Sequence, residues 1–448
     1  MDRGLKSYTK MIFLSVILCL MTFLYACSSE ESGGSGDKVQ ISLSVWGMPF
    51  ENALYTDIYI PEFEEQNPDI EVEFLHYDEL RDRYLTLGAA NDLPDVMRSP
   101  GVNVPEFINR GMFIPLDDYI ESENLDMDNY PEASWVSMQK DDQTFAIPQD
   151  ANSTVLYYDP EAFAEAGLEE PNHDYTMEQM LEDAEKLTIK GNNGNIERYG
   201  FVMGWNADNF ANFVLANGGN IWNEDGTVST VDSSESIEAL EYWRDLVVDF
   251  QLTTSTSDQA QMGPDAYFQA RQAAMYIDGT WMAPSIKNAA PDFNYKATSF
   301  PEGKEKVSRS MSSSFGISKD SDHPDEAWKL IQFLTEKEQL DVYWQSLWVA
   351  APAALSSLED EESFRNVTGV PEADVPGIDS EEEFDEKLGY LKDLFDNQWL
   401  DQTWISPYQN YYADHIDNAI QSVLTEGADP EEALVEAAEN INASINQN

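Results

Sequence analysis

Hydrophobic and polar residues follow two periods in this chain, the two-residue period of strands and the roughly 3.6-residue period of helices. Segments with one period alternate with segments of the other along most of its length. The segments 39–45 (VQISLSV) and 70–74 (IEVEF) alternate apolar and polar residues, which predicts two strands. Between them, 54–66 has apolar residues at helical spacing, and Asn67-Pro68 ends the predicted helix. Strands that alternate with helices predict an α/β fold with largely parallel sheets.

The same alternation continues toward the C-terminus. Further strands are predicted at 95–97, 154–158, 199–203, 273–277 and 315–318. Further helices are predicted at 176–187, capped by Thr176, at 235–250, at 324–334, and as a pair within 410–445. About 420 residues follow the first apolar segment, more than the roughly 250–300 that one hydrophobic core usually serves, so we expect two lobes.

The N-terminus has the pattern of an export signal. Basic residues precede an apolar run of about sixteen residues, 11–26, which is shorter than the roughly 20 that a membrane-spanning helix needs. The run ends in Leu24-Tyr25-Ala26-Cys27, which resembles the bacterial lipobox, whose cysteine is acylated after cleavage. We therefore expect a signal peptide at 1–26, lipidation of Cys27 and a flexible tether at 27–38. The alternative is an ordinary signal peptide with a cysteine there by chance.

Charge excludes one large class of partners. The chain has 25 Lys+Arg against 84 Asp+Glu, a formal net charge of −59, so no basic face is available for nucleic acid. Its hydrophobic content of 42% and aromatic content of 12% indicate a folded body rather than an acidic disordered chain. An anionic membrane surface would also repel this protein, so a lipid has to hold it there.

The acidic excess predicts a stability that depends on salt. Like charges spread over the whole length repel one another in the folded state, and salt screens that repulsion. We expect the midpoint of thermal unfolding to rise when sodium chloride is raised from dilute to molar concentration. Equal stability in dilute and molar salt would contradict an adaptation of this surface to high salt or unusual pH.

No pattern in the sequence predicts catalysis or metal binding. The four histidines are scattered, and the chain has no HExxH, CxxC, GxSxG, Walker or GxGxxG motif. The segments 191–195 (GNNGN) and 223–226 (NEDG) are better explained as turns than as calcium loops. We therefore predict no catalytic residue, no cofactor and no metal. With 84 acidic residues, carboxylate pairs are so numerous that they do not indicate whether a catalytic pair is present. A surface glycoside hydrolase therefore stays an alternative.

Five tryptophans fall at predicted strand ends or in loops. In open α/β sheets, ligands bind beyond the carboxyl ends of the strands, and aromatic faces there suit the C–H faces of sugar rings. The alternative for any one of them is core packing, but the set favours a carbohydrate cleft. They are Trp46, Trp205, Trp281, Trp348 and Trp404.

An ordered set of short segments carries a family resemblance. The segments are 43–46 (LSVW), 93–96 (LPDV), 111–118 (GMFIPLDD), 145–148 (FAIP), 156–160 (LYYDP), 217–219 (NGG), 273–281 (AAMYIDGTW), 315–318 (FGIS), 327–335 (AWKLIQFLT) and 429–434 (DPEEAL). Each is weak alone, but together and in this order they resemble the extracellular solute-binding proteins of ABC importers, of the maltose-binding or multiple-sugar-binding type.

The resemblance implies a fold and a function. The fold is the two-lobed periplasmic-binding-protein-like (type II) α/β fold, in which each lobe is a mixed sheet flanked by helices and a hinge joins the lobes. The implied division gives 39–150 and 277–336 to lobe 1, and 151–276 and 337–448 to lobe 2. The implied function is a monomeric, non-catalytic receptor on the outer face of the cell membrane. It closes on a carbohydrate, an oligosaccharide by its aromatic richness, and delivers it to the membrane permease.

The resemblance also implies which residues bind the ligand. Arg98 falls where many relatives place an aromatic residue, so a hydrogen-bonding role is expected there, with pairing to a surface acid as the alternative. For Asn152 the alternative is a hinge turn. The implied ligand-binding set is Trp46, Asn52, Arg98, Asp150, Asn152, Trp205, Asp208 and Trp281, with Trp348 and Trp404 added from their positions.

Other solutes remain open on the same scaffold. An anionic phosphate ester would need several cations in the site, and only Arg98 stands at a suggested position. Iron would need clustered tyrosines, and Tyr157-Tyr158 and Tyr411-Tyr412 are adjacent pairs whose side chains diverge. A ligand-sensing partner of a membrane kinase has the same sequence features as a transport receptor.

Overall fold

The first sheet is built mainly from the N-terminal part of the chain. The computed structural model describes residues 38–130, 132–192, 195–347, 351–352, 400–401 and 405–447. In the first sheet β1 pairs in parallel with β2 and β3, whereas β14 runs antiparallel to β3 and β6. The order is β2-β1-β3-β14-β6, with bounds Ile70–His76, Val39–Val45, Val96–Pro100, Ser313–Ile317 and Ile147–Pro148.

Helices bury the two faces of this sheet. Because strand side chains alternate between faces, Val96 of β3 joins one hydrophobic cluster and the adjacent Met97 joins another. The helices that contribute to the first cluster are α2 (Pro49–Leu54), η1 (Tyr55–Tyr59), α3 (Ile60–Gln66), α15 (Pro324–Thr335) and α16 (Lys337–Leu347). Those that contribute to the second are α4 (Leu80–Ala90) and α5 (Val104–Asn109).

The second sheet is organised around β7 (Asp150–Tyr158), all nine residues of which are buried. Strand β7 pairs antiparallel with four other strands, so both sheets are mixed, as the family resemblance implies, and the expectation of largely parallel sheets is wrong. The remaining strands of this sheet are β10 (Val202–Met203), β11 (Met275–Gly279), β12 (Lys296–Ser299), β13 (Ser308–Met311), β15 (Ala351–Pro352) and β16 (Leu400–Asp401).

Helices cover the second sheet as well. Two predictions about them are confirmed: Thr176 caps the helix after it in a capping box with Gln179, and the C-terminal pair is separated by Gly427. The helices include α8 (Pro160–Ala166), α9 (Met177–Leu187), α10 (Ala207–Ala216), α11 (Ser234–Arg244), α13 (Pro264–Gln269), η5 (Thr280–Met282), α14 (Ala283–Ala289), α20 (Gln409–Gln421) and α21 (Pro430–Ile445).

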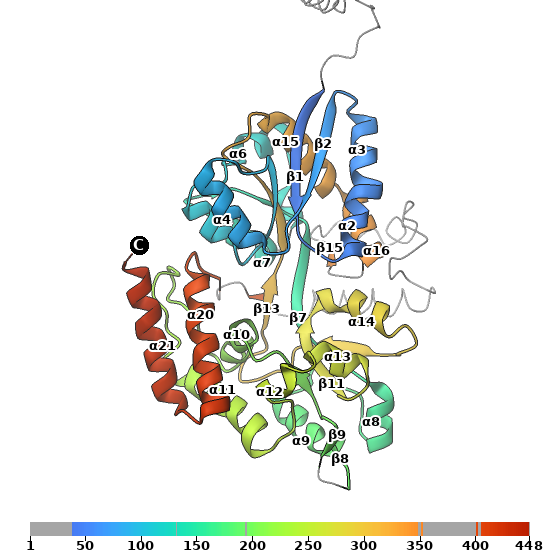
Figure 1. Ribbon diagram of the computed structural model, residues 1–448, viewed down its shortest axis with the longest axis vertical. Helices are drawn as coiled ribbons and strands as arrows, with labels where there is room; N and C mark the ends of the chain where they lie inside the picture. Colours follow the sequence, from blue (N-terminus) through green and yellow to red (C-terminus); the bar gives the residue numbers. More distant parts are fainter. Residues whose placement is uncertain are drawn as a thin grey trace, which may run out of the picture. The chain divides into compact units, whose positions relative to one another are not determined.

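The chain passes between the two sheets at identifiable residues. Gln149 joins β6 to β7, and Ser312 joins β13 to β14. Strands β7 and β13 lie side by side (Figure 1). The predicted division is corrected here, because 277–311 lies with the second sheet and α16 packs with the first. The chain does not cross at the implied boundary between 276 and 277, since β11 runs through both residues to Gly279, which pairs with Thr154.

All described strands and helices belong to one compact unit, Val39–Asn448, with its own hydrophobic clusters. The predicted signal peptide, the tether up to residue 37 and Cys27 lie outside the described residues, as do Trp348 and Trp404. Within the described part of the chain, no helix has the length and apolar composition to cross a membrane.

Candidate functional site

The candidate site lies where the chain passes between the sheets. Strands β13 and β14 form one serine-rich run on either side of Ser312, and small side chains let this run pack closely against β7. Ser310 pairs with Ser153, and Met311 pairs with Asn152. Because these strands belong to both sheets, polar side chains on them contact groups from both halves of the unit.

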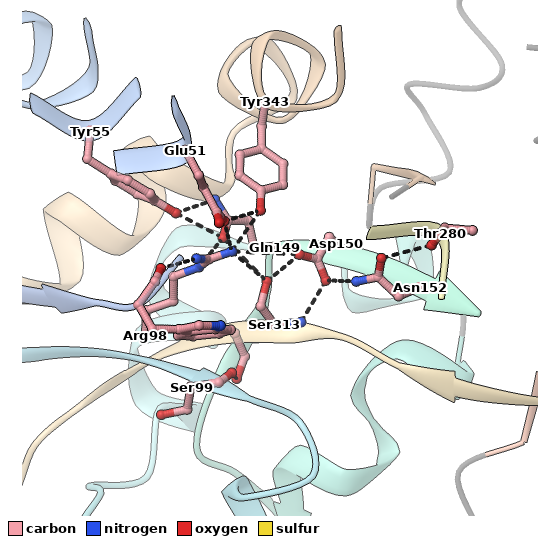
Figure 2. A network of polar contacts seen from close by, with 12 residues as sticks. Glu51, Tyr55, Arg98, Ser99, Gln149, Asp150, Asn152, Thr280, Ser313 and Tyr343 are labelled. Carbon is pink, nitrogen blue, oxygen red and sulfur yellow. Dashed lines mark hydrogen bonds and ion pairs between the residues drawn. The ribbon is translucent and has the colours of Figure 1, made fainter. Parts of the chain in front are cut away.

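Arg98, on β3, is the centre of a buried polar network (Figure 2). It is 2% exposed. Its Nε donates to Gln149 Oε1 at 2.8 Å, and its Nη2 donates to the Tyr343 hydroxyl at 2.7 Å and lies 2.7 Å from Glu51 Oε1. Its Nη1 donates to the carbonyl oxygen of Trp46 at 3.1 Å. Protein groups therefore surround the guanidinium, so the alternative of pairing with a surface acid is wrong.

Two carboxylates face this one cation. Asp150 Oδ2 lies 3.9 Å from Arg98 Nη2, in addition to the closer Glu51. Burial by itself lowers the pKa of the Arg98 guanidinium, but the Glu51 carboxylate and neighbouring groups raise that pKa well above its usual value. Burial raises the pKa of Asp150, and this increase is partly opposed by Arg98 and by the hydrogen bonds from Ser313. The cluster is thus a buried ion network that depends on its cation.

Two predicted residues lie beside the network, Trp46 directly after β1 and Asn52 in α2. The guanidinium carbon of Arg98 lies 4.2 Å from the ring centroid of Trp46, so the guanidinium covers one face of this indole. Trp46 is half-buried. Asn52 is also half-buried, and its Oδ1 accepts no hydrogen bond from the described residues. A buried acceptor left without a donor costs about 1–3 kcal/mol, so this oxygen is an unsatisfied polar group next to the network.

A chain of hydrogen bonds continues from the network into the second sheet. Asp150 Oδ1 accepts from the backbone N–H of Ser313 at 2.6 Å, and its Oδ2 accepts from the Ser313 hydroxyl. Asn152 Nδ2 donates to Asp150 Oδ1 at 2.9 Å, and Thr280 Oγ1 donates to Asn152 Oδ1 at 2.9 Å (Figure 2). The predicted residues Arg98, Asp150 and Asn152 are therefore brought together.

A second group of predicted residues gathers around Arg309 of β13. Its Nη1 lies 3.3 Å from Asp208 Oδ2 at the start of α10, and its guanidinium carbon lies 5.9 Å from the ring centroid of Trp281. Arg309 is 3% exposed, whereas Asp208 and Trp281 are half-buried. Trp281 also packs against the hydrophobic cluster of the first sheet. It therefore touches both halves of the unit while the residue stays partly exposed.

Trp205 is placed differently from the other predicted residues. Its Nε1 donates to the carbonyl oxygen of Thr254 at 2.7 Å. Its ring packs edge-on against Trp243, with the ring centroids 4.9 Å apart. Among the described residues, these contacts join it to the core of the second half and not to Arg98 or Arg309. Its position matches the alternative of core packing.

Sequence reasoning missed several members of the site. Tyr343 contacts Arg98 across 245 positions of sequence, and no local pattern marks such a pair. The serine-rich run 308–314 was a usable signal, because so many small polar residues between two predicted strands are unusual for a plain loop. The missed residues are Gln149, Thr280, Arg309, Ser313 and Tyr343. In the described part of the chain, no three His, Cys, Asp or Glu side chains are grouped to hold a metal ion.

Gly279 gives a test of how Trp281 is seated. A Cβ at position 279 would lie 2.1 Å from the Trp281 ring, so we expect Gly279→Ala to displace the ring and to lower the free energy of unfolding by about 1–3 kcal/mol. Denaturant unfolding measures this loss. In a Trp281→Ala background the clash is gone, so the loss should shrink. An equal loss in both backgrounds would contradict this packing.

Known proteins share this architecture. The family model described as "Bacterial extracellular solute-binding protein" matches residues 51–341, more than half of the chain. The galactooligosaccharide-binding protein of Bacillus subtilis is 24% identical over 373 residues, covering 80% of this chain and 78% of that protein.

Solved structures agree on the fold. An ABC substrate-binding protein of Listeria monocytogenes in complex with cycloalternan matches with a TM-score of 0.78 and 24% identity, covering 92% of this chain and 100% of that one. UgpB of Mycobacterium tuberculosis, in complex with glycerophosphocholine, matches with a TM-score of 0.74 and 17% identity, covering 92% and 99%. The fold is the two-lobed fold of periplasmic binding proteins, and the chain belongs to the family of bacterial extracellular solute-binding proteins.

Proposed function

We propose that this protein is the lipid-anchored, extracellular substrate-binding protein of an ABC importer and that it captures an oligosaccharide. The observation that carries the proposal is that half-buried Trp46 and Asn52 lie beside the first sheet, and half-buried Trp281 and Asp208 beside the second, near the crossing strands. The galactooligosaccharide-binding relative and the cycloalternan complex support a carbohydrate ligand.

The chemistry of these residues suits a sugar. Indole rings offer apolar faces to the C–H groups of a sugar ring, and Trp46 and Trp281 are half-buried rather than sealed in a core. The Asp208 carboxylate is a partly exposed acceptor, which matches the hydroxyl donors of a sugar. A ligand that touches both halves of the unit stabilises their closed arrangement by the contacts that only this arrangement allows.

An anionic ligand fits the site less well, although UgpB, of the same fold, is in complex with glycerophosphocholine. Arg98 is committed to Glu51, Gln149 and Tyr343, and Arg309 is paired with Asp208. A phosphate would need a cation that is not already neutralised, and the net charge of −59 repels anions from the surface. The role we propose is non-catalytic, and the protein acts as a monomer.

The lipid anchor rests on the sequence 24–27, LYAC. Several acyl chains on Cys27 would hold a strongly acidic protein at a membrane surface that otherwise repels it. In cells, Cys27→Ser should therefore shift the protein from the membrane fraction to the medium. Full retention of that variant in the membrane fraction would contradict the anchor and leave sugar binding untouched.

The test of sugar binding uses residues 28–448, which retain the whole compact unit. A panel of mono- and oligosaccharides, with glycerophosphocholine and a phosphate ester for comparison, is titrated at low and high salt. Tryptophan fluorescence and thermal unfolding are followed. A saturable shift with one sugar class is expected. A response only to a non-sugar solute would keep the fold and overturn the proposed ligand.

A further inference from the structure

Trp281 sits on a segment that is anchored to the second sheet through its backbone. The hydroxyl of Tyr157 donates to the carbonyl oxygen of Gly279 at 2.9 Å and lies 3.2 Å from the carbonyl oxygen of Thr280. Gly279 has no side chain, and the Trp281 ring occupies the space that a Cβ would take. The ring is therefore seated directly on the backbone of residue 279, so its orientation depends on how this short segment is held.

One further contact holds the segment from the side of the crossing strands (Figure 2). Thr280 Oγ1 donates to Asn152 Oδ1 at 2.9 Å, and Asn152 Nδ2 donates to Asp150 Oδ1 at 2.9 Å. Asn152 is 7% exposed and Thr280 is 6% exposed. The oxygen and the nitrogen of this amide both bond to protein groups, as expected for a side chain that orients its neighbours.

We propose that Asn152 is a positioning residue, which fixes Thr280 and through it the orientation of Trp281. This inference rests on the proposed function in one respect, which is that Trp281 contacts the ligand. It differs from the role that the family resemblance implies, in which Asn152 contacts the ligand. Because Asp150 is held by Ser313 at the start of β14, the orientation of Trp281 is tied to the strands that join the two sheets.

The test removes the same hydrogen bond from its two ends. Asn152→Leu and Thr280→Val each keep the size of the side chain and remove one partner. We expect each to weaken binding of the oligosaccharide about three- to tenfold, the range expected for one hydrogen bond. The double variant should bind within about twofold of Asn152→Leu, because the shared bond is lost only once. Ser153→Ala is the matched control, since this neighbouring hydroxyl is buried without a hydrogen-bond partner in the described structure.

The alternative gives a different pattern. If Asn152 contacted the ligand directly, Thr280→Val would bind like the wild type and the effect of Asn152→Leu would persist unchanged in the double variant. That pattern would overturn the proposal. Equal loss in Ser153→Ala would also overturn it, because the effect would then belong to the strand and not to this bond.

A second measurement needs no ligand. The chain has 11 tryptophans, so the signal of Trp281 is taken as the difference between each variant and the same variant carrying Trp281→Phe. We expect acrylamide to quench this signal more strongly in Asn152→Leu and Thr280→Val than in the wild type or Ser153→Ala. Unchanged quenching would refute the positioning role. If the wild type bound no sugar at all, the proposed function would fail while this measurement still decided the role of Asn152.

Discussion

Replacing Trp281 by alanine is expected to weaken oligosaccharide binding about thirtyfold. The indole is half-buried and touches both halves of the unit, so its loss removes apolar contact with the ligand in the closed arrangement. Burial of one large aromatic surface is worth about 2 kcal/mol, which corresponds to roughly that change in the dissociation constant. Isothermal titration of the variant beside the wild type measures the difference.

An exposed aromatic residue of the same half supplies the control. Phe250 is 45% exposed at the end of the π-helical turn Asp245–Asp249, away from the contacts of Arg309 and Trp281, and Phe250→Ala should bind like the wild type. Because Trp281 also packs on a hydrophobic cluster, the thermal midpoint of each variant is recorded so that loss of folding is not counted as loss of affinity. Wild-type affinity in a folded Trp281→Ala variant would remove Trp281 from the site.

Removing Arg98 should cause the largest loss of stability in this part of the molecule. Arg98→Ala leaves Glu51 and Asp150 buried without their cation, and breaking a buried ion pair in this way costs about 3–5 kcal/mol. Denaturant unfolding measures the loss. Arg110→Ala is the matched control, because Arg110 also pairs with a glutamate but its side chain is 52% exposed, where such pairs contribute about 0–1 kcal/mol.

The stability deficit of Arg98→Ala should depend on pH. Burial already raises the pKa of Asp150, and loss of Arg98 raises that pKa further. A carboxyl whose pKa is higher in the folded state favours folding below its unfolded pKa and loses that contribution as pH rises through the folded pKa. The deficit should therefore be small in acid and grow as the pH rises above the ordinary range of an aspartate. A deficit independent of pH would show that packing, not charge, causes the loss.

Much of the fold could be predicted because its signals are local. The alternation in 39–45 and 70–74, the cap at Thr176 and the break at Gly427 each lie within a few residues of the element they define. The crossing at Ser312 could not be placed in this way, since a serine-rich run gives no apolar period. The implied lobe boundary at 276–277 was misplaced, because pairing with β7 keeps residues 275–279 in one strand of the second sheet.

The site was accessible to sequence reasoning only in part. Trp46, Arg98, Asp150 and Asn152 come together as their positions suggested, and their roles toward a ligand remain predictions. The partners that determine the state of Arg98 come from distant segments, so nothing near position 98 indicates that its guanidinium is buried and neutralised.

We propose that this chain binds a carbohydrate between its two lobes. Isothermal titration calorimetry of residues 28–448 tests this binding directly. The ligand is the oligosaccharide that shifts the thermal midpoint most, and the titration is repeated at two temperatures. We predict one molecule bound per chain and a negative heat-capacity change, because apolar surface is buried on closure. No heat with any sugar, together with saturable heat from glycerophosphocholine or another phosphate ester, would contradict the account.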